Sequence, residues 1–289
     1  MSIIEHLTIG LDDKVANLGI GLGESGFHNN KILYATIKFL NTIRRNMFIK
    51  ISLFGRNEFI DSILKNSSYE KYKEDILLVS SEEPEKELLN ALEKYEINAA
   101  IRGSFHASKF LTLIKEKFKV SYLNRLALME TFNGFQYFYG PVGIDESNSY
   151  ESKISYISES LNQFHSLRIS PRVSILSGGR KDDSERDEKV KKTLQEAEDI
   201  VKYFKDIDSH IKITHDEICI EKSIEKGSNL IIAPDGISGN LAYRTLVHLG
   251  GGKAYGAIYL DLERTIIDTS RVGKLDEIYG ALLLALALS

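Results

Sequence analysis

The sequence predicts an α/β protein with a mostly parallel sheet. Strand-like and helix-like segments alternate along almost the whole chain, which is typical of consecutive βαβ units. Most strand-like segments are continuous apolar runs, as expected for strands covered on both faces by helices. A chain of 289 residues is also long enough for about two domains. The strands expected from these runs are 15–22, 49–54, 76–79, 99–103, 173–177, 230–233 and 257–262.

The clearest expected helix covers 184–204, because its apolar residues recur at steps of three or four. Ser184 or Asp183 is the expected cap at its start. Another helix, with apolar residues between 154 and 164, precedes the strand at 173. The apolar run 278–288 is predicted to be a helix buried nearly all round. It would measure roughly 16 Å, about half of the hydrocarbon core of a membrane.

The middle of the chain has a different pattern. Two strand-like segments, 122–130 and 135–140, are joined by Asn133-Gly134, a pair that favours a hairpin turn. Gly140-Pro141-Val142-Gly143 follows, and then a polar stretch. We therefore expect a domain boundary at 140–143.

Composition excludes several classes of protein. Charged residues make up 27% of the chain and the net charge is -4, so neither a membrane protein nor a nucleic-acid-binding protein is expected. Cys219 is the single cysteine and has no partner for an internal disulfide. The histidines are scattered and no metal site is expected. No basic, apolar leader begins the chain, so we expect a cytoplasmic protein.

A glycine-rich turn, Gly21 to Gly26, follows the first expected strand and matches G-x-G-x-x-G. In a dinucleotide-binding fold such glycines let the backbone approach a pyrophosphate. The second strand, however, ends in Gly55-Arg56 rather than in an acidic residue that would hold a ribose. A glycine turn without a nucleotide is therefore favoured over a dinucleotide site.

A second turn follows the strand 230–233. It brings Asp235, Ser238 and Asn240 to the start of a helix, with Arg244 one turn further on. Free backbone N–H groups and the helix dipole make such a turn a candidate anion site, to which Gly239 allows close approach. An ordinary helix capped by Asp235 or Ser238 explains the pattern equally well.

A third constellation lies near the carboxyl terminus, where an apolar strand ends in Ser270-Arg271 and Glu277 follows on a helix. Arg271 is suited to clamp a phosphate or carboxylate, Ser270 to donate to an oxyanion, and Glu277 to take a proton. The alternative is that Ser270 caps the helix. Two further strand ends carry candidate polar turns, Gly178-Gly179-Arg180 and Gly103 with His106.

Together these blocks resemble the phosphate acetyl/butyryltransferases. Pro234-Asp235-x-x-x-Gly239-Asn240-x-x-Tyr243-Arg244 is similar to their P-D-x-x-x-G-N-x-x-Y-K/R block, and the segment 265–271 to their V-N-D-L-S-R segment. The stretch 171–177 resembles their P-R-V-A-L-L-S, and Gly103 with His106 their S-G-A-x-H turn. The similarity extends over roughly 98–289.

The resemblance implies a two-domain, three-layer α/β/α fold of the isocitrate/isopropylmalate dehydrogenase type. Its first domain would comprise 1–140 and 257–289, its second 141–256, with an active cleft between them. Family members move an acyl group between phosphate and the thiol of coenzyme A. By this likeness Ser270 and Arg271 would hold an acyl phosphate, and Glu277 would be the base where the family has Asp. No bound cofactor is implied, and coenzyme A is a candidate substrate.

The sequence also departs from that family. It has Gly19-Ile20-Gly21-Leu22-Gly23 where the family shows P-E-G-E-D, and the helix after His106 lacks the family's arginine. These departures resemble a divergent methanogen branch, the MtxX-like methanogenesis marker proteins, which carry the label of methyltransferase subunits.

Three functions are therefore open. The first is a phosphate acyltransferase-like enzyme that binds a phosphate or acyl phosphate. The second is a catalytic or regulatory subunit associated with methyltransferases in an archaeal methanogen. The third is a nucleotide-dependent oxidoreductase. A homodimer is the default expectation for a soluble oligomer.

Overall fold

The computed structural model describes residues 1–9, 11, 14–43, 48–270 and 273–289, and they form two compact units. The first unit comprises 1–123 and 254–289, and the second comprises 124–253. The division falls between 123 and 124, near the start of the predicted hairpin, whereas the boundary predicted at 140–143 lies inside the second unit. The reason is that β5 (Arg125–Glu130) and β6 (Gln136–Gly140) pair with each other, and β6 pairs with a strand of the second unit.

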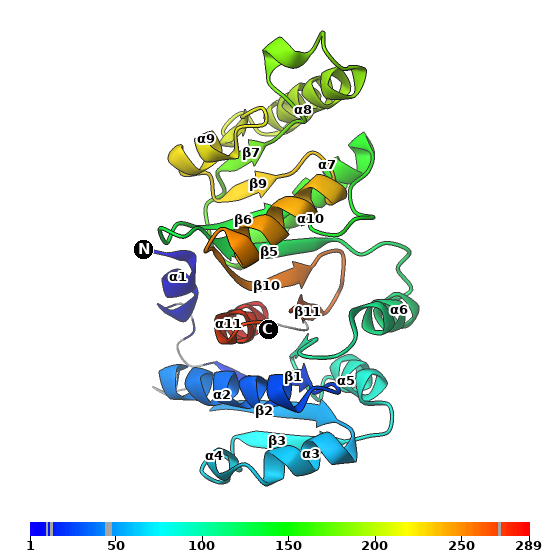
Figure 1. Cartoon of the computed structure of the whole chain (residues 1–289), viewed down its shortest axis with the longest axis vertical. Coiled ribbons are helices and arrows are strands. Elements are labelled where there is room, and N and C mark those ends of the chain that lie inside the picture. The colour runs from blue at the N-terminus through cyan, green and yellow to red at the C-terminus, as the bar shows by residue number, and fades with distance from the viewer. Residues whose placement is uncertain (10, 12–13, 44–47, 271–272) are drawn as a thin grey trace. The chain divides into compact units, whose positions relative to one another are not determined.

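The first unit contains the strands β3-β2-β1-β4-β11-β10, in that order (Figure 1). The first five are parallel, and β10 is antiparallel to β11. The expected strand 257–262 begins and ends earlier than predicted. It stops before Asp261, whose φ of 60° turns the chain towards β11. The bounds are β1 (Val15–Gly21), β2 (Phe48–Gly55), β3 (Ile76–Ser80), β4 (Ala99–Ile101), β10 (Lys253–Tyr259) and β11 (Thr265–Asp268).

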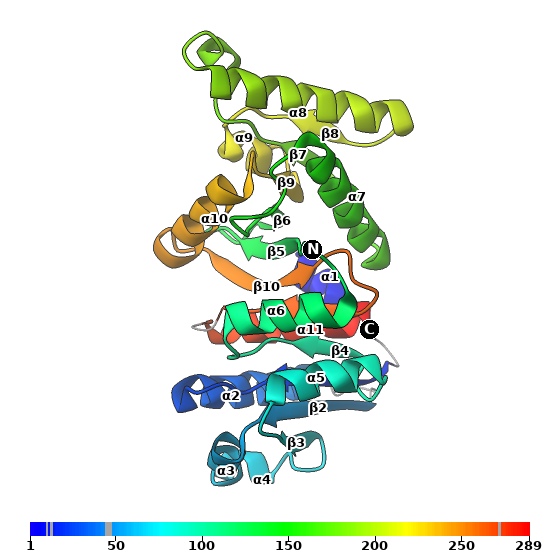
Figure 2. The same ribbon diagram turned by 90° about the vertical axis from the view of Figure 1, so that its right-hand side faces the viewer.

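Helices cover both faces of these strands. Successive strands run from β1 outward to β2 and β3, and the chain then returns to the other side of β1 to form β4. Because such crossovers are right-handed, this reversal places α2 and α5 on opposite faces. In Figure 2, α5 and α6 lie in front of the strands. The helices are α1 (Ile3–Ile9), α2 (Gly26–Ile43), α3 (Asn57–Leu64), α4 (Ser67–Glu70), α5 (Pro84–Glu93), α6 (Ala107–Phe118) and α11 (Leu275–Leu288).

Helix α11 is buried along most of its length, as predicted from its apolar sequence. It packs against α2, β4 and β11 within the first unit. Lys14 Nζ donates to the carbonyl of Leu286 at 2.8 Å and to that of Ser289 at 3.0 Å, so a cation sits at the negative end of this helix. Within the described ranges no helix combines the length and apolarity needed to cross a membrane.

The second unit contains the strands β5-β6-β9-β7-β8, with β5 antiparallel and the others parallel. Strand β8 was not predicted. It has three residues, of which only Ile213 is fully buried, so its sequence contains no apolar run. The remaining strands are β7 (Val173–Ile175), β8 (Ile213–His215) and β9 (Leu230–Ile232). The helices are α7 (Tyr150–Ser166), α8 (Glu188–Ile207), α9 (Ile220–Glu225) and α10 (Gly236–Arg244), with helical turns η1 (Lys181–Asp183) and η2 (Thr245–Leu249).

Helix α8 starts four residues later than the predicted start at Ser184. Its cap is Asp187, whose carboxylate accepts from the N–H groups of Lys189 at 2.8 Å and Val190 at 3.0 Å. Asp183 instead belongs to the short turn η1, where it accepts from the N–H of Arg180. A carboxylate that reaches two free N–H groups outcompetes an earlier cap that would reach none.

Candidate functional site

The loops after β1 and β4 are tied together at the point where the order of the strands reverses. Ser104 donates through Oγ to Asn29 Oδ1 at 2.8 Å and accepts from the N–H of Gly23 at 2.7 Å. The N–H of Ser104 donates to the carbonyl of Gly21 at 3.0 Å. In open α/β sheets such a reversal at the carboxyl ends of the strands is where ligands bind.

Packing between these two loops accounts for the first two glycines of the G-x-G-x-x-G turn, Gly21 and Gly23. A Cβ at Gly23 would lie 2.2 Å from the carbonyl oxygen of Ser104, and one at Gly103 would lie 2.1 Å from that of Gly21. Gly103 also has a φ of 63°, which favours glycine. The third glycine of the motif, Gly26, faces open space. Close approach of two strand-end loops therefore explains the motif without a nucleotide, and the dinucleotide interpretation stays a prediction.

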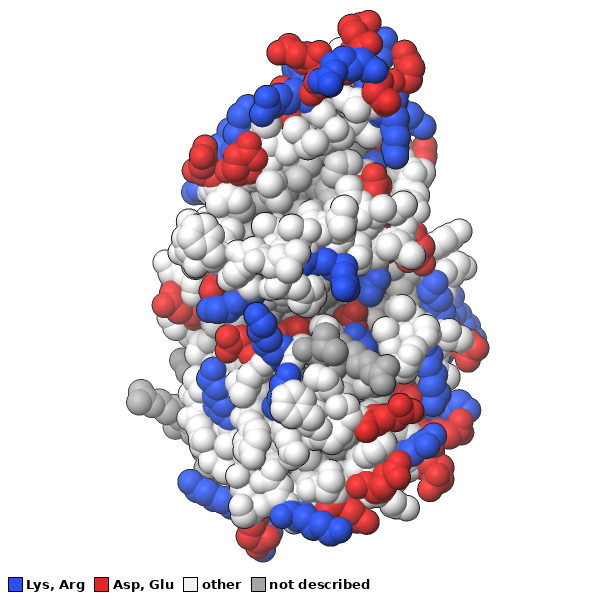
Figure 3. Space-filling model, in the orientation of Figure 1, with Lys and Arg blue, Asp and Glu red and all other residues white. Residues whose placement is uncertain are grey.

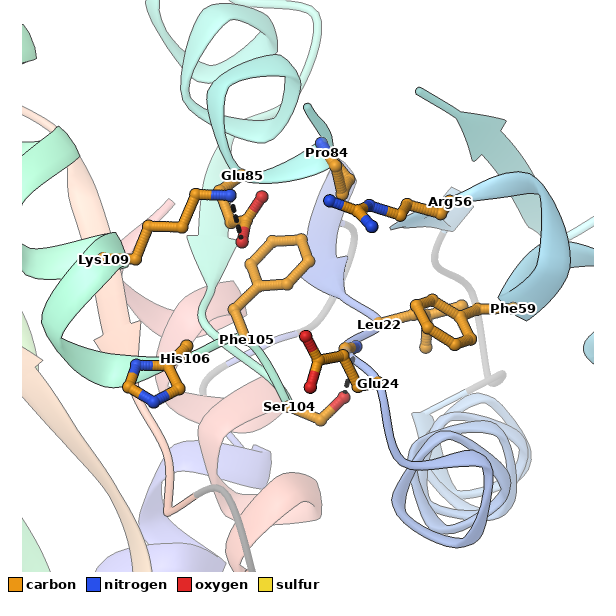
Figure 4. A pocket seen from close by; sticks show the side chains of 11 residues that line it. Leu22, Glu24, Arg56, Phe59, Pro84, Glu85, Ser104, Phe105, His106 and Lys109 are labelled. Atoms are coloured by element: carbon orange, nitrogen blue, oxygen red, sulfur yellow. Dashed lines mark hydrogen bonds and ion pairs between the residues drawn. The ribbon is translucent and has the colours of Figure 1, made fainter. Parts of the chain in front are cut away.

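A cavity of about 220 Å³ opens beside these loops in the first unit (Figure 4). Lys109 in its wall is neutralised by Glu85, with Nζ and Oε1 3.0 Å apart. His106 is exposed at the start of α6, and its Nδ1 lies 3.1 Å from Ser108 Oγ. The cavity is lined by Leu22, Gly23, Glu24, Arg56, Phe59, Pro84, Glu85, Ser104, Phe105, His106 and Lys109.

A buried arginine joins the ends of β4 and β11. Arg102 is only 4% exposed, and its Nε donates to the carboxylate of Asp268. Its Nη1 donates to the carbonyl of Phe105 at 2.7 Å, and its Nη2 donates to that of Thr269. Thr269 Oγ1 in turn donates to the carbonyl of Gly103 at 2.9 Å. This network holds the segment that leads to Ser270.

Glu277 lies beside that segment, on the first turn of α11. Its carboxylate accepts the N–H of Ser270, while its side chain is buried in the protein. Burial raises the pKa of Glu277 to about 7, and the negative charge of Asp268 adds to this, although the Ser270 N–H and Arg102 oppose it. Ser270 is half-buried. The structure therefore brings Ser270 and Glu277 together, whereas Arg271 lies outside the described residues.

The predicted anion turn of the second unit forms the start of α10. Asp235 caps this helix, because its Oδ1 accepts from Ser238 N at 2.8 Å and from Ser238 Oγ at 3.1 Å. Asn240 donates through Nδ2 to the carbonyl of Val142 at 2.6 Å. A Cβ at Gly239 would lie 1.9 Å from the carbonyl oxygen of Pro141. The side chains of Asp235, Ser238 and Asn240 are thus used in capping the helix and in bonding the neighbouring loop. Arg244 is exposed on the last turn of α10.

The turn after β7 is also held by neighbouring groups. The N–H of Gly178 donates to Thr193 Oγ1 at 2.9 Å, and a Cβ at Gly179 would lie 2.5 Å from a methyl group of Val190. Arg180 is exposed. The role of these residues in binding a ligand stays a prediction.

Charges of both signs are interspersed over the face of the molecule in Figure 3. Because the net charge is -4, the chain as a whole does not attract anions, so an anion site must be made locally. In the described part of the chain, no group of three or more His, Cys, Asp or Glu residues is arranged to hold a metal ion.

Comparison with known proteins places the chain in a family. A family model described as phosphate acetyl/butaryl transferase matches residues 89–286, more than half of the chain. The chain belongs to this family. A protein from Methanosarcina barkeri named "Putative methyltransferase mtx subunit X" is 40% identical over 220 residues, or 76% of this chain and 79% of that protein. The predicted likeness to the methanogen branch is thereby confirmed.

Solved structures confirm the predicted fold class. A branched-chain phosphotransacylase from Enterococcus faecalis superposes with a TM-score of 0.67 at 14% identity, covering 96% of this chain and 99% of that one. A 4-hydroxythreonine-4-phosphate dehydrogenase from Burkholderia phymatum superposes with a TM-score of 0.54 at 11% identity, covering 94% and 97%. This member of the phosphate acetyl/butaryl transferase family therefore shares its fold with phosphotransacylases and with a dehydrogenase.

The sequence interpretation missed Arg102 and Asp268 as partners. Each is a charged residue directly after an apolar run of the sequence, which is the one signal the sequence offers. Their meeting depends on the parallel register of β4 and β11, in which Ile101 is opposite Ile267. For this family member the buried arginine is thus a finding of the structure.

Proposed function

We propose that this protein binds a phosphate or acyl phosphate at the Ser270–Glu277 turn and transfers an acyl group between phosphate and a thiol. Membership of the phosphate acetyl/butaryl transferase family supports the reaction class. The observation that carries the proposal is Glu277, a buried carboxyl group beside Ser270 whose pKa is raised to about 7. A carboxyl group with such a pKa can exchange a proton at neutral pH.

The reaction needs one proton transfer and one exchange of bonds. The Glu277 carboxylate takes the proton of the thiol, and the resulting thiolate attacks the carbonyl carbon of the acyl phosphate. The carbon–sulfur bond forms, the carbon–oxygen bond to the phosphoryl group breaks, and inorganic phosphate leaves. A thiol has an ordinary pKa of about 8.5, so a base with a pKa near 7 is well matched to it. Coenzyme A is the proposed thiol.

Ser270 is proposed to orient the acyl phosphate. Its backbone N–H donates to Glu277, and its hydroxyl group would donate to the oxygen that gains charge in the transition state. In the second unit, the exposed cations Arg180 and Arg244 are proposed as anion-binding groups. Gly178, Asp235 and the other turn residues would act by shaping the backbone beside them.

The test is thioester formation from acetyl phosphate and coenzyme A by the purified protein. We expect activity in the wild type and a loss of about 10²–10⁴-fold in Glu277→Gln, since the amide cannot accept the thiol proton. The matched control is Asp276→Asn, the neighbouring carboxylate, which pairs with Lys38 at 3.6 Å on the surface. An inactive wild type, or equal losses in both variants, would contradict the proposal.

A second candidate function is that of a subunit in a methyltransferase complex. The supporting observation is the name of the Methanosarcina barkeri relative, a methyltransferase subunit X. Affinity capture with the tagged protein from a methanogen extract, followed by mass spectrometry, tests it. Recovery of methyltransferase proteins is the expected result, and their absence alongside intact bait would count against a complex.

A further inference from the structure

Arg102 occupies a position that is set by the register between two strands. It directly follows β4, and Asp268 is the last residue of β11. Because Ile101 is opposite Ile267 in the parallel pair, the next residues along, Arg102 and Asp268, meet at the carboxyl ends of the strands. The N–H of Arg102 also donates to the carbonyl of Ile267 at 3.0 Å.

The guanidinium group bonds both the segment that leads to Ser270 and the loop after β4. It donates to the carboxylate of Asp268, the carbonyl of Thr269 and the carbonyl of Phe105. A planar group that bonds three acceptors at fixed angles restrains each of them. The peptide that follows Thr269 carries the N–H of Ser270, so its position depends on this restraint.

The charge of Arg102 also acts on Glu277. The charged groups that act on this carboxyl group are Asp268 from β11 and Arg102 from the end of β4. Lys31 from α2 lies near the turn before α11, with its Nζ 3.5 Å from the carbonyl of Gly273. On α11 itself, Lys274 is exposed and Asp276 is half-buried. Among these described groups, Arg102 is the buried cation. Its positive charge partly compensates the negative charges of two buried carboxyl groups, those of Asp268 and Glu277.

We propose that Arg102 is a positioning residue for the Ser270–Glu277 site: it holds the 268–270 segment so that the Ser270 N–H meets Glu277, and its charge stabilises the Glu277 carboxylate. Its effect on acyl transfer rests on the function proposed above. Its effect on the ionisation of Glu277 does not, and can be measured in the absence of turnover.

Two substitutions separate these roles. Arg102→Met removes both the charge and the fork of N–H groups. Arg102→Lys keeps the charge, but its single ammonium group cannot reproduce the three-way contact. We therefore expect the methionine variant to change both the ionisation of Glu277 and the rate, and the lysine variant to lower the rate at constant ionisation.

The direct measurement is a ¹³C NMR titration of the full chain labelled at the glutamate side-chain carboxyl carbon, with Glu277 assigned from the Glu277→Gln variant. In Arg102→Met the titration midpoint of Glu277 should rise by about one pH unit, because an attractive charge is lost. In Arg102→Lys the midpoint should stay within experimental error. The matched control is Arg125→Met, which removes the half-buried arginine bonded to Glu146 in the second unit and should leave Glu277 unchanged.

A folded Arg102→Met with an unchanged Glu277 midpoint would overturn the proposal. If that variant does not fold, Arg102→Gln provides the test. It removes the charge but keeps a hydrogen-bonding side chain, so the Glu277 midpoint should again rise, and an unchanged midpoint would overturn the proposal. Midpoint shifts in a protein without acyl-transfer activity would support the role of Arg102 while contradicting the proposed function.

Discussion

Each unit buries a glutamate near an arginine, and the two glutamates differ in their hydrogen-bond and charge partners. In the second unit Glu146 accepts from Arg125 Nε at 2.8 Å, from the N–H of Val142 at 3.1 Å and from the N–H of Gly143 at 2.9 Å. In the first unit the guanidinium of Arg102 bonds Asp268, and Glu277 accepts the N–H of Ser270.

The difference lies in what opposes the cost of burial. Burial raises the pKa of both glutamates, but at Glu146 the charge of Arg125 and its hydrogen bond work against it, together with the Gly143 N–H. At Glu277 the nearby Asp268 adds to burial instead, and the pKa reaches about 7. A buried carboxylate with several hydrogen bonds and a charge partner holds a loop in place. A buried carboxyl group with fewer such partners has a raised pKa and can exchange a proton near neutral pH.

The largest expected effect is a difference in acyl-transfer activity between variants of the two glutamates. Glu277→Gln should lower acyl transfer by about 10²–10⁴-fold, whereas Glu146→Gln should lower it only in proportion to lost folded protein. In the wild type the rate should rise with pH through about 7, because only the ionised form of Glu277 takes a proton. Initial rates measured from about pH 5.5 to about pH 8.5 test this pH dependence. A rate that falls as pH rises through 7 would exclude Glu277 as the base.

The next largest effect concerns stability, measured as the free energy of unfolding. Arg125→Met leaves Glu146 buried without its charge partner, which should cost about 3–5 kcal/mol of unfolding free energy. Arg186→Met is the control, since its pair with Asp183 at 2.6 Å is exposed on the arginine side and should contribute at most about 1 kcal/mol. Urea unfolding followed by circular dichroism measures both variants. Similar losses in the two would mean that the buried pair is no stronger than a surface one.

The fold class was predictable because the apolar runs are long and the strand–helix alternation is regular. The runs that became β1 and β2 fall within a residue or so of their predicted bounds. The shorter strand β8 was missed, since one buried isoleucine in three residues gives no pattern. The start of α8 was also misplaced, because several acidic residues precede it and only the folded loop shows that Asp187 reaches the free N–H groups.

The candidate site was predictable only in part. Ser270 and Glu277 are seven residues apart on a strand end and the following helix, so local spacing was enough to pair them. Arg102 and Asp268 are separated by 166 residues and meet through the register of β4 and β11. A single sequence carries no information on that register, because either strand could shift by a residue in an apolar run.

A third prediction uses the dependence of stability on pH. The pKa of Glu277 rises from 4.5 to about 7 on folding, so the folded state holds its proton more tightly. Its contribution to stability is therefore fully present below pH 4.5 and is lost as the pH rises through 7, by about 3 kcal/mol in total. Comparing urea unfolding of the wild type and Glu277→Gln at acidic, intermediate and alkaline pH isolates this term. A free-energy difference that does not change with pH would show that Glu277 titrates normally.

The smallest expected effect concerns Asp235, the carboxylate that begins α10. Its hydrogen bonds go to its own helix, so Asp235→Ala should cost about 1 kcal/mol of stability, while Asp235→Asn, which also caps well, should cost less. If the turn only caps the helix, inorganic phosphate should bind the wild type and Asp235→Asn with equal affinity by calorimetry. Tighter binding in the asparagine variant would indicate instead that an anion lies against this turn, because the substitution removes a repulsive charge. The start of α10 would then be an anion site of the second unit, in contrast to the proton-exchanging carboxyl group of the first unit.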